Sequence, residues 1–287
     1  NNIVRLPSKN FLQVKLICDL LKKLSKKKIY KKSFNRLLLI KYENSDLISS
    51  ELSKNVEARV IWGGDNTVNK FKSFKTKPRC VDLAFSNRYS ISLIDSNKLA
   101  LLNHEDLVTL TKKFYNDTYT MDQFGCSSPN SVFWLGNNNI AKKRFWSELS
   151  KVINNTYDLN LSGANKKISN LMNYTLVKNK KFKANLQNFN LVTLKSKELN
   201  FDNYENVNFG TFLEINLKDI NYLKKYTSEK LQTITYYGTD FKNIKNFIIK
   251  NRVKGIDRIV PIGRAFDLTP EWDGIDIIST LSRTIGA

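Results

Sequence analysis

The feature that most constrains the fold is a regular alternation of short apolar runs and helical segments over the first ninety-five residues. The runs have the composition of buried strands, and the segments between them repeat apolar residues at helical spacing. The strand-like runs are 1–6, 35–42, 57–62, 79–86 and 89–95, and the helical segments are 11–24, 45–55 and 65–74. Strands and helices that alternate at this spacing predict a parallel sheet built from βαβ units.

From about residue 97 the chain changes character, and a second α/β unit is predicted. A long helix is expected at 103–120, where Asn103 can cap the first turn and Asp106 occupies its third position. The polar segment 181–208 is expected to be an irregular surface connection. Further helices are expected at 140–153, 166–177, 240–251 and 274–283, and further strands at 131–136, 208–217, 231–238 and 257–263. We therefore predict an α/β fold with domains 1–96 and 97–287, the C-terminal tail returning to the first domain.

The composition excludes several classes of protein. With 41% hydrophobic residues the chain can bury a sizeable core. Its longest apolar runs fall short of the ~20 residues that span a bilayer, and no signal peptide is recognisable, so we expect a soluble, cytoplasmic protein. Three widely spaced cysteines and one histidine, His104, form neither a disulfide framework nor a metal-binding pattern.

The formal net charge of +21 suggests an anionic partner. Lysines are dispersed along the chain and arginine, the better reader of bases, is scarce, so the sequence does not favour nucleic acid. Heavy use of Lys and Asn under an AT-rich genome explains the charge equally well. A third possibility is a phosphate-bearing small molecule such as a nucleotide or coenzyme A.

Two strand-to-helix turns are candidate cofactor-binding sites. "VIWGGDNTV" places Gly63 and Gly64 where a strand meets a helix, and backbone N–H groups at such a turn can bind phosphate. "VRLPSKN" has the same topology, with Ser8 as a possible helix cap and the cations Arg5 and Lys9 beside it. The lack of a nearby acidic residue favours the 2′-phosphate of NADP over the ribose of NAD. An ordinary tight turn and an ordinary capped helix remain the simpler alternatives.

The cysteines differ in their surroundings. Cys18 lies in the apolar stripe of a helix, and Cys80 precedes a strand, so both are expected to pack structurally. Cys126 lies in "TMDQFGCSSPNSVFW", between a helix and a strand, with Gly125 before it and two serines after it. A thiol nucleophile needs small neighbours and backbone N–H donors, and this loop can supply both.

"DQFGCSSPNSVFW" resembles the cysteine loop of bacterial long-chain acyl-CoA reductases of the luminescence type, a branch of the aldehyde dehydrogenase superfamily. "RVIWGGDNTVNKF", "LQTITYYG" and "GIDRIVPIG", followed by "WDG", occur in the family's order and spacing, so the resemblance runs along nearly the whole chain. It implies a Rossmann-like cofactor domain, entered partway through, and a catalytic domain with Cys126 as nucleophile. The thiolate would attack an acyl thioester, and NADPH would reduce the acyl-enzyme to a free aldehyde, with no metal.

The resemblance has three departures. The superfamily's lysine for the adenosine ribose is replaced by Leu6, so Arg5 or Lys9 would have to substitute. The glutamate with which hydrolytic members activate water aligns with Ala84, which suits reduction rather than hydrolysis. The superfamily's oxyanion-hole asparagine would lie before residue 1, so an N-terminal part is expected to be missing.

The alternatives are an aldehyde dehydrogenase working in the oxidative direction, an inactive fragment, or a basic polyanion-binding protein. The resemblance further implies acyl-CoA or an acyl donor protein as partner, together with acyl-protein synthetase and acyl-transferase subunits. By the same analogy we expect a homo-oligomer.

Overall fold

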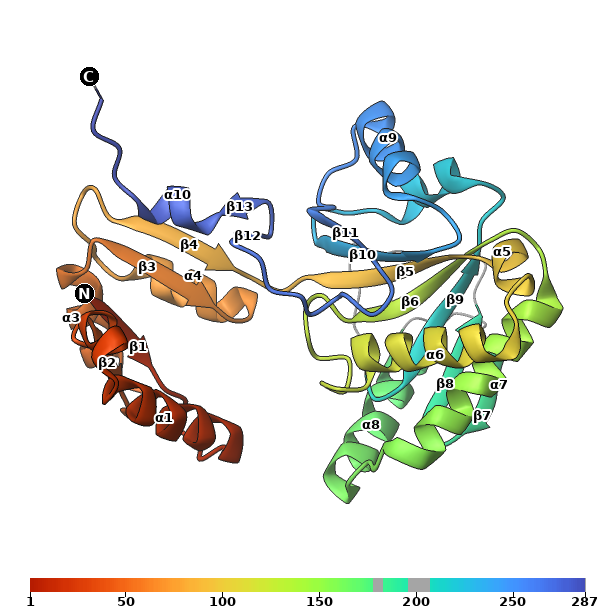
Figure 1. Ribbon diagram of the computed structural model, residues 1–287, viewed down its shortest axis with the longest axis horizontal. Coiled ribbons are helices and arrows are strands. Elements are labelled where there is room, and N and C mark those ends of the chain that lie inside the picture. Colours follow the sequence, from red (N-terminus) through yellow and green to blue (C-terminus); the bar gives the residue numbers. More distant parts are fainter. Residues whose placement is uncertain (178–182, 196–206, 287) are drawn as a thin grey trace. The chain divides into compact units, whose positions relative to one another are not determined.

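The computed structural model describes residues 1–177, 183–195 and 207–286, and the chain divides into two compact units, Asn1–Ala84 and Phe85–Ala287 (Figure 1). This division differs from the predicted domains 1–96 and 97–287. Strand β5 (Tyr89–Asp95) belongs to the second unit, because it pairs with β6 (Pro129–Leu135) on one side and β10 (Leu231–Tyr237) on the other.

The first unit contains two short sheets. Strands β1 (Asn2–Arg5) and β2 (Leu37–Ile40) pair in parallel, with α1 (Leu12–Ser25) between them in the chain, as the alternation of elements predicts. Strands β3 (Ala58–Trp62) and β4 (Val81–Phe85) form a second, separate pair, so the run at 57–62 does not join the predicted parallel sheet with the runs at 1–6 and 35–42. The remaining elements are η1 (Lys28–Tyr30), α2 (Lys31–Phe34), α3 (Asp46–Asn55) and α4 (Asp65–Ser73).

A bidentate ion pair joins β3 to β4. Arg59 donates from Nε to Asp82 Oδ1 at 2.7 Å and from Nη2 to Oδ2 at 2.5 Å, and its Nη1 reaches the Phe71 carbonyl at 2.6 Å. Two parallel N–H···O bonds to one carboxylate define a guanidinium's orientation as well as its position. The pair therefore holds the strand before the Gly63–Gly64 turn against its neighbour.

Two predictions about α1 are wrong. Its N-cap is Phe11, which makes no side-chain capping bond, so Ser8 does not cap the helix. The helix also has no buried residue, and Cys18 is only partly covered, although a core position was expected for it. Leu16, Ile17 and Leu20 are all more than half exposed. An apolar stripe predicts that a helix can bury one face, but what covers that face depends on tertiary structure.

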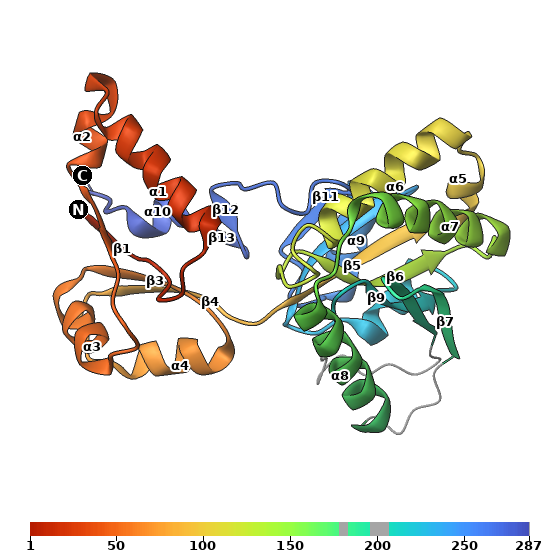
Figure 2. The ribbon, with the colours of Figure 1, turned by 90° about the horizontal axis from the view of Figure 1, so that it is seen from below.

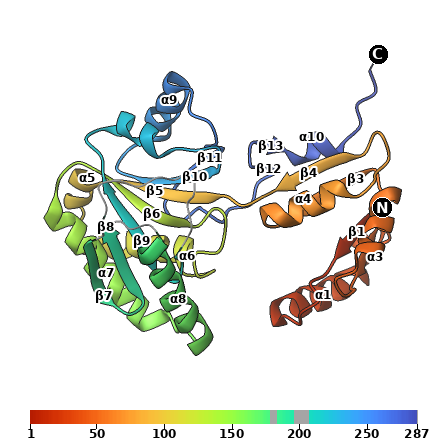
Figure 3. The same cartoon turned by 180° about the vertical axis from the view of Figure 1, so that it is seen from behind.

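The second unit is built on a seven-stranded sheet with the order β11-β10-β5-β6-β9-β8-β7. Every pairing is parallel except that of β7 (Lys183–Asn188) with β8 (Leu191–Lys195). Strands β9 (Thr211–Asn216) and β11 (Arg258–Pro261) complete it. Figure 3 shows the strands running from β7 at one edge to β11 at the other.

Helices cover both faces of this sheet, which explains its continuous apolar strands. On one face, α5 (Ser96–Ala100), α6 (His104–Thr118) and α7 (Asn139–Thr156) pack on Ile94, Val132 and Trp134 through residues such as Phe114 and Phe145. On the other face lie η2 (Ile220–Tyr226), α9 (Phe241–Asn251) and, towards the β8 edge, α8 (Leu161–Val177) (Figure 2). The antiparallel pair β12 (Glu271–Trp272) and β13 (Ile275–Asp276) and helix α10 (Ile277–Leu281) follow β11.

The predicted helix start at Asn103 is confirmed. Asn103 Oδ1 accepts from the Asp106 N–H at 2.8 Å, and Asn103 Nδ2 donates to the Asp106 carboxylate at 2.9 Å. His104, the first residue of α6, is exposed.

The segment 181–208 was predicted as an irregular connection, and its described part corrects this. Residues 183–195 form the β7–β8 hairpin, and Leu191, Val192 and Leu194 are buried. Residues 181–182 and 196–206 lie outside the described part. The polar residues on β7 obscured the strand pattern, because β7 is exposed along most of its length while β8 is interior.

A buried lysine gives a testable feature of the α8 packing. Lys167 is 1% exposed, and its Nζ donates to the Phe209 carbonyl at 2.6 Å. Burial lowers the pKa of this amine to about 7. An unfolded lysine stays protonated to about pH 10, so between these values the unfolded chain binds more protons and the fold gains stability as pH rises.

We predict that wild type gains stability relative to Lys167→Met from pH 7 to pH 9, by up to about 1.4 kcal/mol per pH unit. Urea unfolding of both proteins at several pH values measures this difference, and groups common to both cancel. A difference that does not change with pH would contradict the buried position of the amine.

Candidate active site

Cys126 lies in the loop between α6 and β6, as predicted, and the backbone of this loop has an unusual shape. Asp122 and Gln123 both adopt left-handed conformations, with φ of 50° and 62°. Two successive residues of this kind, neither of them glycine, need tertiary contacts to hold them. Tyr157 supplies one, because its hydroxyl donates to Asp122 Oδ1 at 2.5 Å.

The Gln123 side chain supplies further tertiary contacts that hold these two left-handed residues. This side chain is 1% exposed and, among the described residues, its hydrogen-bond partners are all backbone groups. Oε1 accepts from the N–H groups of Gly210 and Thr211 at 2.7 and 3.2 Å, and Nε2 donates to the carbonyls of Pro129 and Thr211, both at 3.3 Å. One buried amide thus ties the cysteine loop to the starts of β6 and β9.

Two serines hold the cysteine itself. Ser90 Oγ donates to the Cys126 carbonyl at 2.6 Å and accepts from the Thr233 N–H at 3.2 Å, which links the loop to β5 and β10. Ser128 Oγ donates to the Asp117 carbonyl at 2.7 Å, which links it to α6. The backbone on both sides of Cys126 is therefore fixed, while the residue remains partly accessible.

The thiol has one side-chain hydrogen-bond donor among the described residues. Gln232, at the start of β10, directs Nε2 to the Cys126 Sγ at 3.3 Å. Burial raises the pKa of the Cys126 thiol, and the nearby Asp273 carboxylate raises it further. The Gln232 hydrogen bond and the backbone N–H groups of Cys126 and Ser127 lower this pKa. The net effect is a raised pKa, and Gln232 supplies the side-chain hydrogen bond to the sulfur.

A charged cluster lies behind Gln232. Its Nε2 also donates to the Asp273 carboxylate, and Arg88 pairs with Asp257 and lies 3.9 Å from Asp273. Arg88 additionally donates to the carbonyls of Leu231 and Gly255. The cluster thereby joins the starts of β5, β10 and β11 beside the thiol.

The segment after β11 packs on the cysteine loop. A Cβ on Gly125 would lie 2.7 Å from the ring of Phe266, so glycine permits this approach. Asp117 holds the same segment, since its carboxylate accepts from the N–H groups of Gly263 at 2.6 Å and Ala265 at 3.0 Å.

The predicted cofactor residues lie in the first unit. Arg5 ends β1, donates to Asn44 Oδ1 at 3.3 Å and stacks on the Tyr42 ring at 4.4 Å. Ser8 and Lys9 are exposed in the connection to α1. Lys41, which follows β2, reaches Asn10 in that connection at 2.6 Å. Ligands of parallel sheets bind beyond the carboxyl ends of strands, where these residues lie.

Gly63 and Gly64 form the turn between β3 and α4. Gly64 is the N-cap and makes no side-chain capping bond, so the first N–H groups of α4 have no side-chain acceptor from their cap. A Cβ on Gly63 would meet the Thr67 side chain at 3.0 Å. This geometry fits a phosphate, although Asp65 in the first turn opposes one electrostatically.

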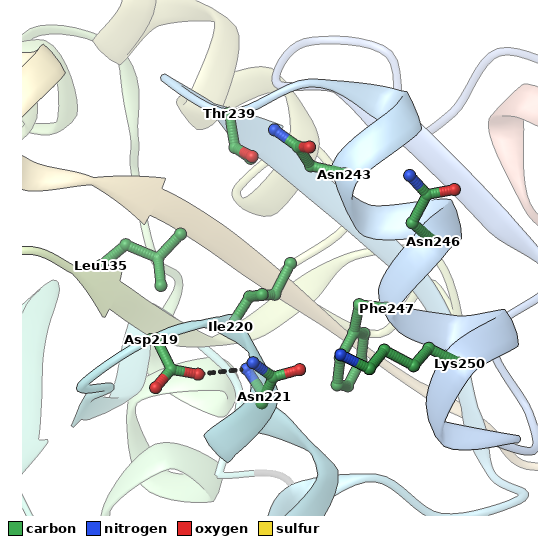
Figure 4. A pocket seen from close by; sticks show the side chains of 9 residues that line it. All are labelled: Leu135, Asp219, Ile220, Asn221, Thr239, Asn243, Asn246, Phe247 and Lys250. Carbon is green, nitrogen blue, oxygen red and sulfur yellow. Dashed lines mark hydrogen bonds between the residues drawn. The ribbon is translucent and has the colours of Figure 1, made fainter.

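A separate groove of about 410 Å³ lies at the carboxyl ends of the strands in the second unit's sheet, away from the strand starts beside Cys126. Leu135, Ile220 and Phe247 contribute apolar surface, and Asn221, Asn243 and Lys250 add polar groups (Figure 4). Leu135 ends β6, whereas Cys126 precedes its start, and a seven-residue strand measures roughly 20 Å. The groove is therefore not part of the cysteine site.

Comparison with protein families identifies the chain. The family model described as acyl-CoA reductase (LuxC) matches residues 13–284. The chain belongs to the acyl-CoA reductase (LuxC) family. The predicted family is confirmed. A comparison with curated proteins gives no significant match.

Solved structures show the same fold. An NADP-dependent enzyme of E. coli matches with a TM-score of 0.60 at 10% identity, over 91% of this chain and 55% of that one. Betaine aldehyde dehydrogenase from Staphylococcus aureus gives 0.59 at 10% identity, over 90% and 53%. An NAD-dependent aldehyde dehydrogenase from Sinorhizobium meliloti gives 0.55 at 10% identity, over 82% and 49%. The predicted aldehyde-dehydrogenase-like α/β fold is confirmed, and the chain spans about half the length of these structures.

The sequence singled out Cys126 but not the side chains around it. Ser90, Gln232 and Asp273 are 36, 106 and 147 positions away from Cys126 in the chain. Gln232 lies in a strand with the pattern of a buried element, which gives no sign of a polar contact. Among the described residues, no group of three His, Cys, Asp or Glu could hold a metal, and no helix is long and apolar enough to cross a bilayer.

The Asp117 carboxylate makes the support of the loop sensitive to pH. Burial raises its pKa to about 6, above the ordinary 3.8. The fold therefore holds this proton more tightly than the unfolded chain, and the stability it contributes is complete below about pH 4 and is lost as pH rises through 6.

We predict that the stability of wild type relative to Asp117→Asn falls by up to about 1.4 kcal/mol per pH unit from pH 4 to pH 6. Urea unfolding at half-unit steps measures the difference, since asparagine does not titrate. A difference that grows with pH in this range would show that Asp117 is ionised throughout.

Proposed function

We propose that this chain reduces acyl-CoA, with a long acyl chain, to the aldehyde through a thioester on Cys126, with NADPH as the reductant. The observation that carries the proposal is the fixed position of Cys126 at the start of β6, with Gln232 Nε2 3.3 Å from its sulfur, in a chain of the acyl-CoA reductase (LuxC) family.

In the first step the Cys126 thiolate attacks the thioester carbonyl. The bond to the coenzyme A sulfur breaks, and coenzyme A leaves as a thiolate that takes up a proton. The backbone N–H groups of Cys126 and Ser127 lower the pKa of the thiol, so they are suited to stabilise negative charge that develops beside it. The acyl group is then held by Sγ.

In the second step a hydride reaches the acyl carbon, which is the chemistry that bound NADPH would supply. The resulting oxyanion collapses, the bond from carbon to Sγ breaks, and the electron pair returns to sulfur. Aldehyde is released and the Cys126 thiolate is restored. Gln123 and Ser90 keep the backbone of the loop still while this bond forms and breaks.

The cofactor residues we propose are Gly63 and Gly64 for the phosphates, with Arg5, Ser8 and Lys9 for the adenosine end. The uncapped start of α4 supports the first group, and the cations at the carboxyl ends of β1 and β2 support the second. The similar solved structures include both an NADP-dependent enzyme and an NAD-dependent enzyme. The preference for NADPH therefore rests on Arg5 and Lys9.

The setting of the reaction is also part of the proposal. The acyl donor is acyl-CoA or an acyl-carrying protein, and synthetase and acyl-transferase subunits are the proposed partners, with the protein working in the cytoplasm as a homo-oligomer. The oxidative direction is the alternative, and the aldehyde dehydrogenases among the similar structures favour testing it. Aldehyde with NADP, with and without coenzyme A, compares the two directions.

We predict that incubation with radiolabelled acyl-CoA in the absence of NADPH labels wild type and that Cys126→Ala is not labelled. Cys80→Ala is the matched control and should label as wild type does, because Cys80 precedes β4 in the other unit. Addition of NADPH should release the label as aldehyde. Equal labelling of wild type and Cys126→Ala would exclude the mechanism.

We also predict that Arg5→Ala and Lys9→Ala each weaken NADPH binding by about tenfold, the size expected for one lost charge-assisted contact, and leave NADH binding unchanged. Fluorescence titration of the reduced cofactors measures both. Lys23→Ala, an exposed lysine of α1, is the control. If NADPH and NADH binding fall together, these residues do not read the 2′-phosphate.

A further inference from the structure

We propose that Gln232 is a catalytic hydrogen-bond donor that stabilises the Cys126 thiolate, and that Asp273 is the residue that positions its amide. The proposal rests on Cys126 being the nucleophile, as above. Activated cysteines usually have a histidine within hydrogen-bond reach. Here the side chain at that distance is an amide, with Nε2 3.3 Å from Sγ.

The contacts of the amide determine which end faces the sulfur. Asp273, when ionised, can only accept hydrogen bonds, so the group beside it must be the NH₂ of Gln232. On the other side, the Thr233 hydroxyl donates to Gln232 Oε1 at 3.1 Å. A flipped amide would place its oxygen against the carboxylate. Both contacts therefore direct the NH₂ group to Sγ.

Arg88 lies on the other side of Asp273. Burial raises the pKa of the Asp273 carboxyl, and the Arg88 guanidinium, 3.9 Å away, opposes this rise. Arg88 is itself held by Asp257 and by backbone carbonyls. The orientation of one amide is thus determined by a chain of contacts that runs from β5 to the turn between β12 and β13.

The charged groups around the thiol act in opposite directions. The Asp273 carboxylate disfavours a thiolate, while the Arg258 guanidinium, which stacks on Trp272 at 4.5 Å and interacts electrostatically with Cys126, favours one. Arg88 and Asp257 form a pair, so their charges largely cancel. Gln232 lies between Asp273 and the sulfur and offers a donor where the carboxylate alone would repel negative charge.

An amide cannot accept the thiol proton, so Gln232 is not a general base, and the proton passes to water. Its N–H group favours negative charge on Sγ at two points of the reaction. The first is formation of the thiolate, and the second is breakage of the bond between carbon and Sγ, when the electron pair returns to sulfur. Loss of one hydrogen bond to a charged group corresponds to roughly one to two pKa units, or about a ten- to hundredfold change in the thiolate fraction.

The test measures the rate of Cys126 alkylation by iodoacetamide between pH 6 and pH 10, in a background with Cys18→Ala and Cys80→Ala. We expect Gln232→Leu to raise the thiol pKa and to slow alkylation at pH 8 by about tenfold or more. Gln232→Glu has the same size and adds negative charge, so it should also slow the reaction. Asp273→Asn removes a negative charge but keeps an acceptor for Gln232, so it should lower the thiol pKa and speed alkylation.

Thr235→Val is the matched control, because Thr235 lies on the same strand and bonds to Ser92 at 2.6 Å. It should leave the pH profile unchanged. Thermal unfolding of each variant shows whether it folds, and a general structural defect would not change the rate in opposite directions at residues 232 and 273.

An unchanged pH profile in both Gln232 variants would overturn the proposal, as would an equal slowing in Gln232→Leu and Asp273→Asn. Alkylation needs neither acyl-CoA nor NADPH. If the profile shifts while acyl labelling of wild type fails, the donor role stands and the proposed reaction falls. If labelling succeeds and the profile does not shift, the proposed reaction stands and the donor role of Gln232 falls.

Discussion

The structure of the site depends on the parallel pairing of β5, β6, β9 and β10. Parallel strands place all their starts at one edge of a sheet, so the residues that begin these four strands meet although they are far apart in the chain. At this edge Ser90 and Gln232 each bond to Cys126. Gln123, in the cysteine loop, bonds to Thr211 at the start of β9. Helices on both faces bury the sheet, so the starts of its strands, where Cys126 lies, stay accessible.

Two glutamines beside the cysteine illustrate how surroundings decide the role of a side chain. In the described part of the chain the Gln123 side chain makes four hydrogen bonds, all to backbone, and these hold two left-handed residues in place, so its role is structural. Gln232 bonds to a sulfur, a carboxylate and a hydroxyl, so its amide has one defined orientation and one donor directed at a reactive atom. Both are buried, and burial makes an unsatisfied amide costly, which is why each has a single arrangement.

The sequence predicted the elements better than their association. The βαβ unit of β1, α1 and β2, the cap at Asn103 and the strands of the second unit follow from local patterns. The hairpin at 183–195 did not, because β7 is exposed and polar while β8 is buried by elements distant in sequence. Helix α1 has an apolar stripe but no buried residue, since a stripe indicates which face can be buried and not what will cover it.

The sequence by itself indicated the family and singled out Cys126 and the small residues around it, because glycine and serine in a loop between a helix and a strand are local features. Only the tertiary structure decided which side chains surround Cys126. Ser90, Gln232 and Asp273 come from three separate segments, and parallel pairing together with the turn before β13 brings them together. Contacts between residues more than a hundred positions apart leave no periodicity in a single sequence, so the donor at the sulfur could not be read from it.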